Sequence, residues 1–175
     1  MLTIFIITNI DNDIYHKIHN DWKNPALDVI MDGTEKVTGF APYAIANLGV
    51  IYFGKEKEVK TTKLALTAWG LSSLTTIGIR FAVNRPRPED SVTSRWNSSF
   101  PSWHTTSYFS MATVYANKYP KLAIPLYSFG ALVGLSRIYQ GYHYPSDVLV
   151  GAVLGWASGK LTLKLEKLLN RFFHF

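Results

Sequence analysis

Five stretches of this 175-residue chain contain no Asp, Glu, Lys or Arg, and such stretches limit the folds that the chain can adopt. They are residues 37–54, 64–79, 96–117, 122–136 and 148–159. Their lengths lie near or below the ~18–20 apolar residues with which a helix crosses a bilayer. A soluble helical core could contain one or two of them, but five in series, with the charges confined to the gaps, favour membrane helices. The sequence therefore predicts an all-α, polytopic membrane helical bundle.

The distribution of charged residues along the chain predicts three parts. We expect about five transmembrane helices, at residues 37–54, 62–83, 102–118, 121–139 and 147–168. Five Asp residues interrupt residues 1–36, which we expect to form amphipathic helices on the membrane surface. The chain is thus expected to be one integral membrane domain, with an interfacial segment at 1–36, a transmembrane core at 37–168 and a tail at 169–175.

The basic residues predict how this bundle is oriented. Lys residues gather in the gaps at 55–63 and 118–121, and Lys160, Lys164, Lys167 and Arg171 form a basic stripe near the C-terminus. The positive-inside rule places such segments in the cytoplasm. The gaps at 84–101 and 137–147, and the N-terminus, then lie on the extracytoplasmic face. Because no aromatic platform is interleaved with these charges, no nucleic-acid partner is expected.

The gap at 137–147 carries residues suited to chemistry on a phosphate group. Arg137 supplies a permanent cation, and His143 and Asp147 follow it. A histidine can attack phosphorus, and a carboxylate on one ring nitrogen leaves the other nitrogen free as a nucleophile. Alternatively, Asp147 is a helix-start acid that the helix dipole favours. That alternative explains one residue but not the set.

An upstream cluster adds two further cations. Arg80 and Arg87 lie seven residues apart, and a helix that ends near Asn84 would place Arg87 on the following loop. Arg side chains match phosphate oxygens and keep their charge. Arg80 interrupts an apolar stretch, where an ionisable group is functional by default. For Arg85 and Arg87 the alternative is a loop charge or a lipid headgroup contact.

Another cluster, Pro101-Ser102-Trp103-His104, precedes the third predicted span. Ser102 is expected at the helix N-terminus, where free N–H groups bind anions, and His104 in the first turn. With His143 on the same face, a general acid/base role for His104 is favoured over an interfacial one. A metal site formed by His104, His143 and Asp147 is the chemical alternative. Against it, the Arg side chains already neutralise the charge that a metal would neutralise.

These clusters resemble the motifs of the type 2 phosphatidic acid phosphatase (lipid phosphate phosphatase) family, in the vanadium haloperoxidase-like superfamily. The family pattern is Lys-x6-Arg-Pro, Pro-Ser-Gly-His and Ser-Arg-x5-His-x3-Asp. The third motif matches at Ser136, Arg137, His143 and Asp147. In the first motif Arg80 stands in place of Lys, which keeps the charge but changes the reach. In the second, Trp103 stands in place of Gly.

The resemblance implies a metal-independent reaction that needs no cofactor. The catalytic residues would be His143, His104 and Asp147. His143 would attack phosphorus and form a phosphohistidine, His104 would protonate the leaving oxygen and then activate water, and Asp147 would orient His143. The phosphate would be bound by Arg80, Arg87, Ser102, Trp103 and Arg137.

The resemblance also implies a location and a class of substrate. We expect a multi-pass protein of the bacterial cytoplasmic (inner) membrane, with its active site on the periplasmic face. The candidate substrates are lipid A 1-phosphate, undecaprenyl pyrophosphate and phosphatidylglycerophosphate, and the compact size is similar to that of bacterial lipid A 1-phosphatases. The bilayer and the lipid are the expected partners, with no obligate protein partner evident. The alternatives are a non-catalytic membrane protein that binds lipid phosphates and a soluble acid phosphatase.

Overall fold

The computed structural model describes residues 2–89 and 94–173, which form helices and the loops that join them. Helices α1 (Leu2–His16) and α2 (Pro25–Thr38) are joined through a π-helical turn at Lys17–Asp21. They are followed by α3 (Phe40–Phe53), α4 (Glu56–Val83), α5 (Trp103–Lys118), α6 (Ala123–Tyr139), α7 (Pro145–Lys164) and α8 (Glu166–Phe173). Single 3₁₀ turns lie at Arg95–Asn97 and Pro120–Leu122. The predicted all-α class is confirmed.

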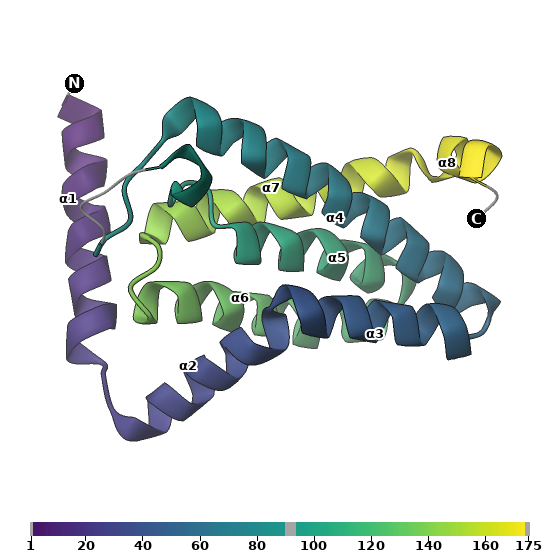
Figure 1. The fold of residues 1–175 in the computed structure, drawn as a ribbon, viewed down its shortest axis with the longest axis horizontal. Coiled ribbons are helices and arrows are strands. Elements are labelled where there is room, and N and C mark those ends of the chain that lie inside the picture. The colour runs from purple at the N-terminus through teal and green to yellow at the C-terminus, as the bar shows by residue number, and fades with distance from the viewer. Residues whose placement is uncertain (1, 90–93, 174–175) are drawn as a thin grey trace.

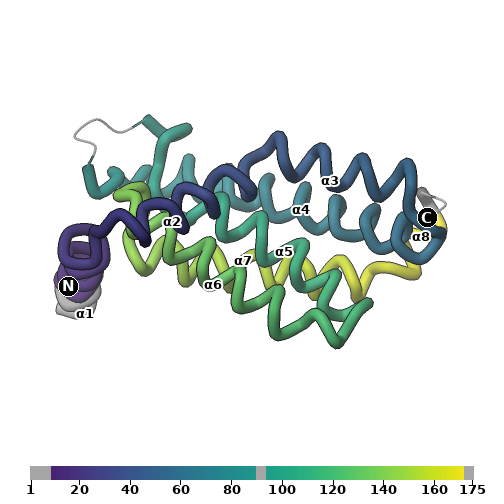
Figure 2. The backbone as a smooth tube through the Cα atoms, turned by 90° about the horizontal axis from the view of Figure 1, so that it is seen from below, coloured from purple at the N-terminus to yellow at the C-terminus, as the bar shows by residue number. Residues whose placement is uncertain are grey.

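Helices α3 to α7 run along the long axis of the molecule, and α1 lies across one end of them (Figure 1). The turned view in Figure 2 shows α1 nearly end-on, with α2 leading away from it towards α3. The loops from α4 to α5 and from α6 to α7 lie at the α1 end. The connections from α3 to α4 and from α5 to α6, together with α8, lie at the opposite end. The fold therefore brings all three predicted phosphate-binding clusters to one end of the bundle.

Helix α5 lies at the centre of the bundle, in contact with α4, α6 and α7. Its contact with α7 depends on Gly151, Gly155 and Gly159, which recur every four residues along one face of α7. A Cβ atom at Gly155 would lie 2.3 Å from the backbone oxygen of Thr106, and one at Gly159 would lie 2.7 Å from that of Ser110. The two helix backbones are therefore closer together than any side chain at these positions would allow.

Hydroxyl side chains fill much of the space around α5. Thr105, Thr106, Ser107 and Ser110 are all 0% exposed. Thr106 donates a hydrogen bond of 2.9 Å to the backbone oxygen of Ser102, one turn earlier. Between helices, Ser72 of α4 donates to Ser110 over 3.2 Å. Small residues and hydrogen bonds across helices are the contacts with which helices pack inside membranes.

The outward faces of α3, α4, α6 and α7 carry large apolar side chains. The exposed ones include Ile45, Leu48, Leu74, Ile124, Leu149 and Val153. A soluble monomer rarely leaves large apolar patches exposed. An apolar exterior around an interior rich in hydroxyl groups fits a helical bundle that is solvated by lipid.

The number of membrane crossings remains a prediction. Helices occupy all five predicted places. Within residues 2–89 and 94–173, however, only the helical stretch Pro120–Tyr139 is both long and apolar enough to cross a membrane, and Phe40–Phe53 is apolar but shorter. The Ser, Thr and Gly residues that serve the tight packing of α4, α5 and α7 also lower their hydropathy.

Local sequence sets the helix ends that hold the candidate site. Helix α4 ends at the predicted place, where Asn84 adopts a left-handed φ of 48°. Ser102 is the N-cap of α5, as predicted, and Pro145 opens α7. The fifth predicted span, 147–168, is not one helix, because α7 ends at Lys164 and α8 starts at Glu166. The first part of the predicted tail is therefore helical.

The predicted interfacial segment at 1–36 does consist mainly of helices. Asn24 caps α2 by accepting hydrogen bonds from the N–H groups of Ala26 (3.1 Å) and Leu27 (3.0 Å). Helix α2 buries Met31, while Val29 on the same helix is 74% exposed. One apolar residue thus packs into the protein and another faces outwards, and the location of this segment on the membrane surface stays a prediction.

Candidate active site

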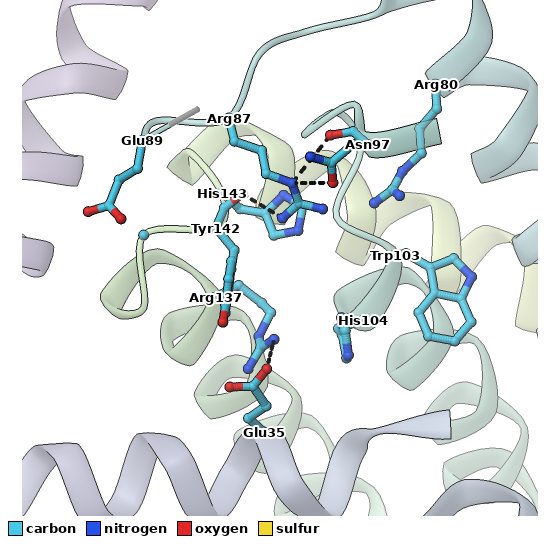
Figure 3. Close-up of a pocket in the computed structure, with 11 residues that line it drawn as sticks. Glu35, Arg80, Arg87, Glu89, Asn97, Trp103, His104, Arg137, Tyr142 and His143 are labelled. Carbon is cyan, nitrogen blue, oxygen red and sulfur yellow. Dashed lines mark hydrogen bonds and ion pairs between the residues drawn. The ribbon is translucent and has the colours of Figure 1, made fainter. Parts of the chain in front are cut away.

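Six of the eight predicted site residues line one pocket of about 490 Å³ at the α1 end of the bundle (Figure 3). They are Arg80, Arg87, Trp103, His104, Arg137 and His143. Glu35, Glu89, Asn97, Gly141 and Tyr142 complete the lining. The other two predicted residues, Ser102 and Asp147, are 0% exposed and lie behind the pocket wall. The three sequence clusters therefore form a single site.

The loop between α6 and α7 places His143 at the pocket wall. The backbone oxygen of Arg137 accepts hydrogen bonds from the N–H groups of Tyr142 (3.0 Å) and His143 (3.2 Å), which folds the chain back over the end of α6. Gly141 has a φ of 81°, which favours glycine. A Cβ atom there would also lie 2.9 Å from the carboxyl carbon of Glu89. In this loop His143 is only 2% exposed.

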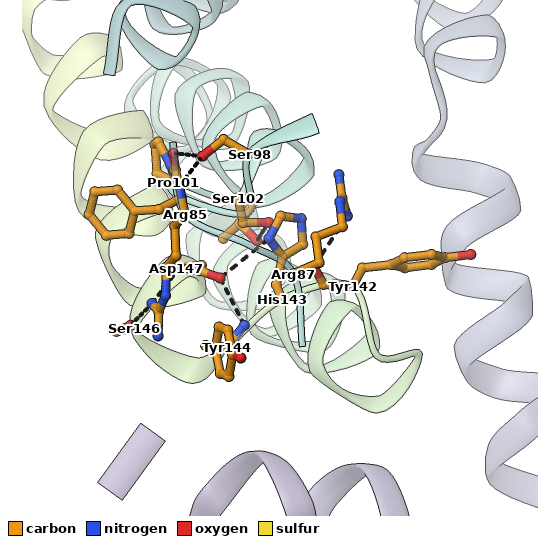
Figure 4. Close-up of polar contacts among 12 residues, drawn as sticks. Arg85, Arg87, Ser98, Pro101, Ser102, Tyr142, His143, Tyr144, Ser146 and Asp147 are labelled. Atoms are coloured by element: carbon orange, nitrogen blue, oxygen red, sulfur yellow. Dashed lines mark hydrogen bonds and ion pairs between the residues drawn. The ribbon is translucent and has the colours of Figure 1, made fainter. Parts of the chain in front are cut away.

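Asp147, in the first turn of α7, faces His143 (Figure 4). Its Oδ2 lies 3.6 Å from Nδ1 of His143, which is longer than a hydrogen bond. In the described part of the chain that buried Nδ1 has no hydrogen-bond partner. The same Oδ2 accepts a hydrogen bond of 2.8 Å from the N–H of Tyr144. A small shift of the imidazole would close the contact, as often happens in active sites when a ligand binds.

Burial lowers the pKa of His143 to about 4, against the opposing effect of Asp147. Since a free histidine titrates near pH ~6.5, the buried ring stays neutral and keeps a lone pair at pH values where an exposed ring is protonated. We expect NMR of ¹³C-labelled histidine to show a titration midpoint near 4 for His143, with His143→Ala identifying the signal. Asp147→Asn should lower the midpoint further. A midpoint near that of exposed histidine would contradict this expectation.

Arg137 brings a buried cation to the pocket. Its side chain is 2% exposed, and its Nη1 lies 3.3 Å from Oε1 of Glu35 in α2. Its Nη2 donates to Oε1 of Gln140, and the guanidinium lies 5.3 Å from the ring centre of Tyr142. A carboxylate therefore already faces the cation that would bind a phosphate. An entering phosphate would compete with Glu35 for Arg137.

Arg80 and Arg87 each donate hydrogen bonds to carbonyl oxygens at the pocket. Nε of Arg87 donates to the side-chain oxygen of Asn97 (3.0 Å), and Nη1 donates to the backbone oxygen of Tyr142 (3.2 Å). Arg80 donates through Nε (3.3 Å) and Nη2 (3.2 Å) to the backbone oxygen of Pro101. These contacts hold both guanidinium groups at the pocket, and a guanidinium group matches the oxygens of a phosphate.

The start of α5 is joined to the start of α7. The N–H of Ser102 donates to the backbone oxygen of Asp147 over 3.0 Å, and the Ser102 hydroxyl accepts a hydrogen bond from Thr105. Trp103 is the first residue of α5, so its backbone is helical and a side chain is tolerated there. Its ring lies edge-on to His104, with 5.4 Å between ring centres. Trp103 therefore forms a part of the pocket wall beside His104.

Arg85 and Asp11 belong to this site although the sequence motifs did not identify them. Arg85 is not a solvated loop charge, because its Nη1 lies 2.8 Å from Oδ1 of Asp147 and its Nη2 lies 2.8 Å from Oδ2 of Asp11. Its guanidinium also lies 4.0 Å from the ring centre of Tyr144. One signal was available in the sequence, since Asp11 is the first acid after the apolar run of residues 1–10.

The metal alternative does not match the arrangement of the side chains. Within the described ranges, no three His, Asp or Glu side chains are grouped so that they could hold one ion. His104, His143 and Asp147 thus do not form the three-ligand set considered from the sequence.

Comparisons with known proteins identify relatives over most of the chain. The sequence pattern of the PAP2 superfamily matches residues 61–171. Undecaprenyl-diphosphatase BcrC of Bacillus subtilis is 30% identical over 173 residues, covering 91% of this chain and 86% of that protein. The lipid A 1-phosphatase of Porphyromonas gingivalis is 31% identical over 53% of this chain and 21% of that protein. The crystal structure of Aquifex aeolicus LpxE has a TM-score of 0.75 and 28% identity, covering 89% of this chain and 95% of that one.

Proposed function

This chain belongs to the PAP2 superfamily, and on that premise we propose that it removes a phosphate group from a membrane lipid through a phosphohistidine formed on His143. Its relatives are phosphatases, so the chain is a phosphoric ester hydrolase. One observation carries the proposed mechanism. Three Arg side chains and two His side chains, drawn from three separate parts of the sequence, line one pocket.

The first step would use His143 as the nucleophile. With Nδ1 directed towards Asp147, Nε2 is the nitrogen that holds the free lone pair. Nε2 attacks the terminal phosphorus, and the bond between that phosphorus and the oxygen that joins it to the rest of the lipid breaks. His104 gives a proton to that leaving oxygen. Asp147 stabilises the positive charge that develops on the imidazole of His143.

The second step would restore the enzyme. His104, now neutral, takes a proton from water, and the water oxygen attacks phosphorus as the bond to Nε2 of His143 breaks. Phosphate leaves, and His104 is again protonated. Arg80, Arg87 and Arg137 stabilise the charge on the phosphoryl oxygens in both steps, which is usually the largest contribution to this kind of catalysis.

Ser102 and Trp103 would bind the phosphate through the backbone at the start of α5, whereas the three Arg residues would bind it through their side chains. Ser102 is buried behind the wall, so it would act through the N-terminus of α5, whose free N–H groups attract anions. Trp103 would contribute its backbone N–H at the same helix end, while its indole shapes the pocket beside His104.

Undecaprenyl pyrophosphate is the substrate that the relatives favour. The undecaprenyl-diphosphatase of Bacillus subtilis aligns over nearly the full length of both proteins. The lipid A 1-phosphatase aligns over about half of this chain. We therefore place undecaprenyl pyrophosphate before lipid A 1-phosphate and phosphatidylglycerophosphate.

The charge distribution supports an extracytoplasmic site in a cytoplasmic membrane. At the end of the bundle away from the pocket, Lys57 lies 4.7 Å from the ring centre of Tyr119, and Lys118 pairs with Glu166 over 2.6 Å. The two Lys-rich gaps of the sequence are thus brought together there. Positive charge is retained on the cytoplasmic side of membrane proteins, so the pocket would open on the periplasmic side.

A phosphate-release assay on the purified protein in detergent tests the activity and its substrate. We expect release from undecaprenyl pyrophosphate to exceed release from lipid A 1-phosphate, phosphatidylglycerophosphate and a soluble phosphate ester. Activity should persist in EDTA, because fixed guanidinium groups neutralise the phosphate.

Other outcomes of this assay would contradict the proposed function in different ways. A preference for the soluble ester would reject the lipid substrate, and binding of lipid without any release would indicate a non-catalytic protein. Loss of activity in EDTA, restored by a divalent ion, would overturn the metal-independent mechanism. When His143→Ala is measured in the same assay, His16→Ala is its matched control, because His16 is an exposed histidine at the end of α1.

A further inference from the structure

Arg85 links two buried carboxylates that come from opposite parts of the sequence. It lies on the loop after α4, and its side chain is 22% exposed. One end of its guanidinium pairs with Asp147, which is 0% exposed, and the other end pairs with Asp11 of α1, whose side chain is 5% exposed. Its Nη1 also donates 2.7 Å to the hydroxyl of Ser146 (Figure 4).

Asp11 in turn fixes the start of α7. Its Oδ1 accepts a hydrogen bond of 2.8 Å from the N–H of Ser146, and its Oδ2 contacts the Ser146 hydroxyl. Ser146 immediately precedes Asp147. The carboxylate of α1 therefore caps the helix that carries Asp147 and, through Arg85, also holds the Asp147 side chain.

These contacts determine the orientation of the Asp147 carboxylate. Oδ1 is bound by Arg85, and Oδ2 is bound by the N–H of Tyr144 and faces His143. If Arg85 were absent, Oδ1 would be buried without this partner and the carboxylate could rotate about its side-chain bonds. A displacement of about 1 Å in a catalytic group can cost on the order of 10²-fold in rate.

We propose that Arg85 and Asp11 are positioning residues for the nucleophile, and that α1 is therefore part of the active site. The inference rests on the proposed role of His143. Arg85 is not among the residues that line the pocket, so it acts through Asp147 rather than through the phosphate. Asp11 lies outside residues 61–171, the part of the chain that matches the family pattern.

The test compares Arg85→Lys and Asp11→Asn with Arg95→Lys and Asp13→Asn. Arg95 is an exposed Arg of the same loop, and Asp13 is an exposed Asp of the same helix. A Lys side chain keeps the charge but cannot bridge two carboxylates. We expect Arg85→Lys to lower kcat by about 10–100-fold and Asp11→Asn by about tenfold, by analogy with the losses found when the residues that orient metal ligands are replaced. KM should stay within about threefold in both, because neither residue contacts the phosphate.

A double variant separates positioning from a general loss of structure. Since both residues act on Asp147, Arg85→Lys with Asp11→Asn should lower kcat little further than Arg85→Lys alone. Guanidinium ions at millimolar concentration should restore part of the kcat of an Arg85→Ala variant and should leave Arg95→Ala unchanged. A melting temperature in detergent identifies any variant that has merely unfolded.

The results that overturn this inference differ from those that overturn the proposed function. Unchanged kcat in Arg85→Lys and Asp11→Asn, with His143→Ala inactive, would reject the positioning role alone. A rise in KM without a change in kcat would assign Arg85 to phosphate binding instead. Full activity of His143→Ala would reject the proposed mechanism itself.

Discussion

Replacing His143 with Ala is expected to lower phosphate release by about 10⁴-fold or more, the loss seen when the nucleophile of a catalytic triad is removed. The imidazole is buried beside Asp147 and lines the pocket, and the α6–α7 loop has no second histidine that could replace it. The pocket cations remain in this variant, and it should still bind phosphate. Initial rates on the preferred lipid, with phosphate affinity from calorimetry, measure the two effects separately.

Two further measurements complete this test. Radiolabelled substrate mixed briefly with the unaltered protein and quenched in base should leave an acid-labile, base-stable label, as expected of a phosphohistidine, and His143→Ala should leave none. His104→Ala should slow release of the label more than His16→Ala does. Activity of His143→Ala within tenfold of the unaltered protein would assign the nucleophile to another residue.

Replacing Gly155 with Leu is expected to abolish folding, and Gly155→Ala to destabilise the protein by about 1–3 kcal/mol, the usual cost of overpacking. Even the Cβ atom of Ala would lie 2.3 Å from the backbone oxygen of Thr106 and 2.8 Å from Cβ of Phe109. The helices would have to separate, which would also strain the hydrogen bond between Ser102 and Asp147. Thermal unfolding in detergent, followed by circular dichroism, measures the effect on stability.

Gly70→Ala is the matched control for Gly155→Ala. Gly70 lies in the interior of α4, and a Cβ atom there would have no atom within 4 Å. Ala should therefore be neutral or stabilise by about 0.4–1 kcal/mol, because it restricts the unfolded chain. Equal melting temperatures for Gly155→Ala and Gly70→Ala would show that the close approach of α5 and α7 does not limit stability.

Some of the site could be predicted because its signals are local. The spacing from Arg137 to His143 and Asp147 depends only on the end of one helix and the start of the next. The helix end near Asn84 and the start at Ser102 follow from residues within one turn. Such features depend on backbone preferences over a few residues, so a single sequence is sufficient to find them.

Other features were present in the sequence but acquired meaning only in the fold. Gly151, Gly155 and Gly159 recur at the four-residue spacing typical of close helix packing, yet the spacing does not name the partner helix. The structure identifies α5. Glu35 reads as an ordinary acid of an amphipathic helix, although the fold places it against Arg137.

By itself the sequence determined the helical class, the positions of the core helices and the set of groups that we propose to act on phosphate. Apolar length, helix caps and motif spacing are short-range properties, and each is encoded within a few turns. Only the tertiary structure decided which groups are adjacent. Asp11, Arg85 and Asp147 come from a helix, a loop and a second helix, and their charges are buried together because burying any one of them alone would cost too much. That requirement links distant segments, and no local pattern in the sequence expresses it.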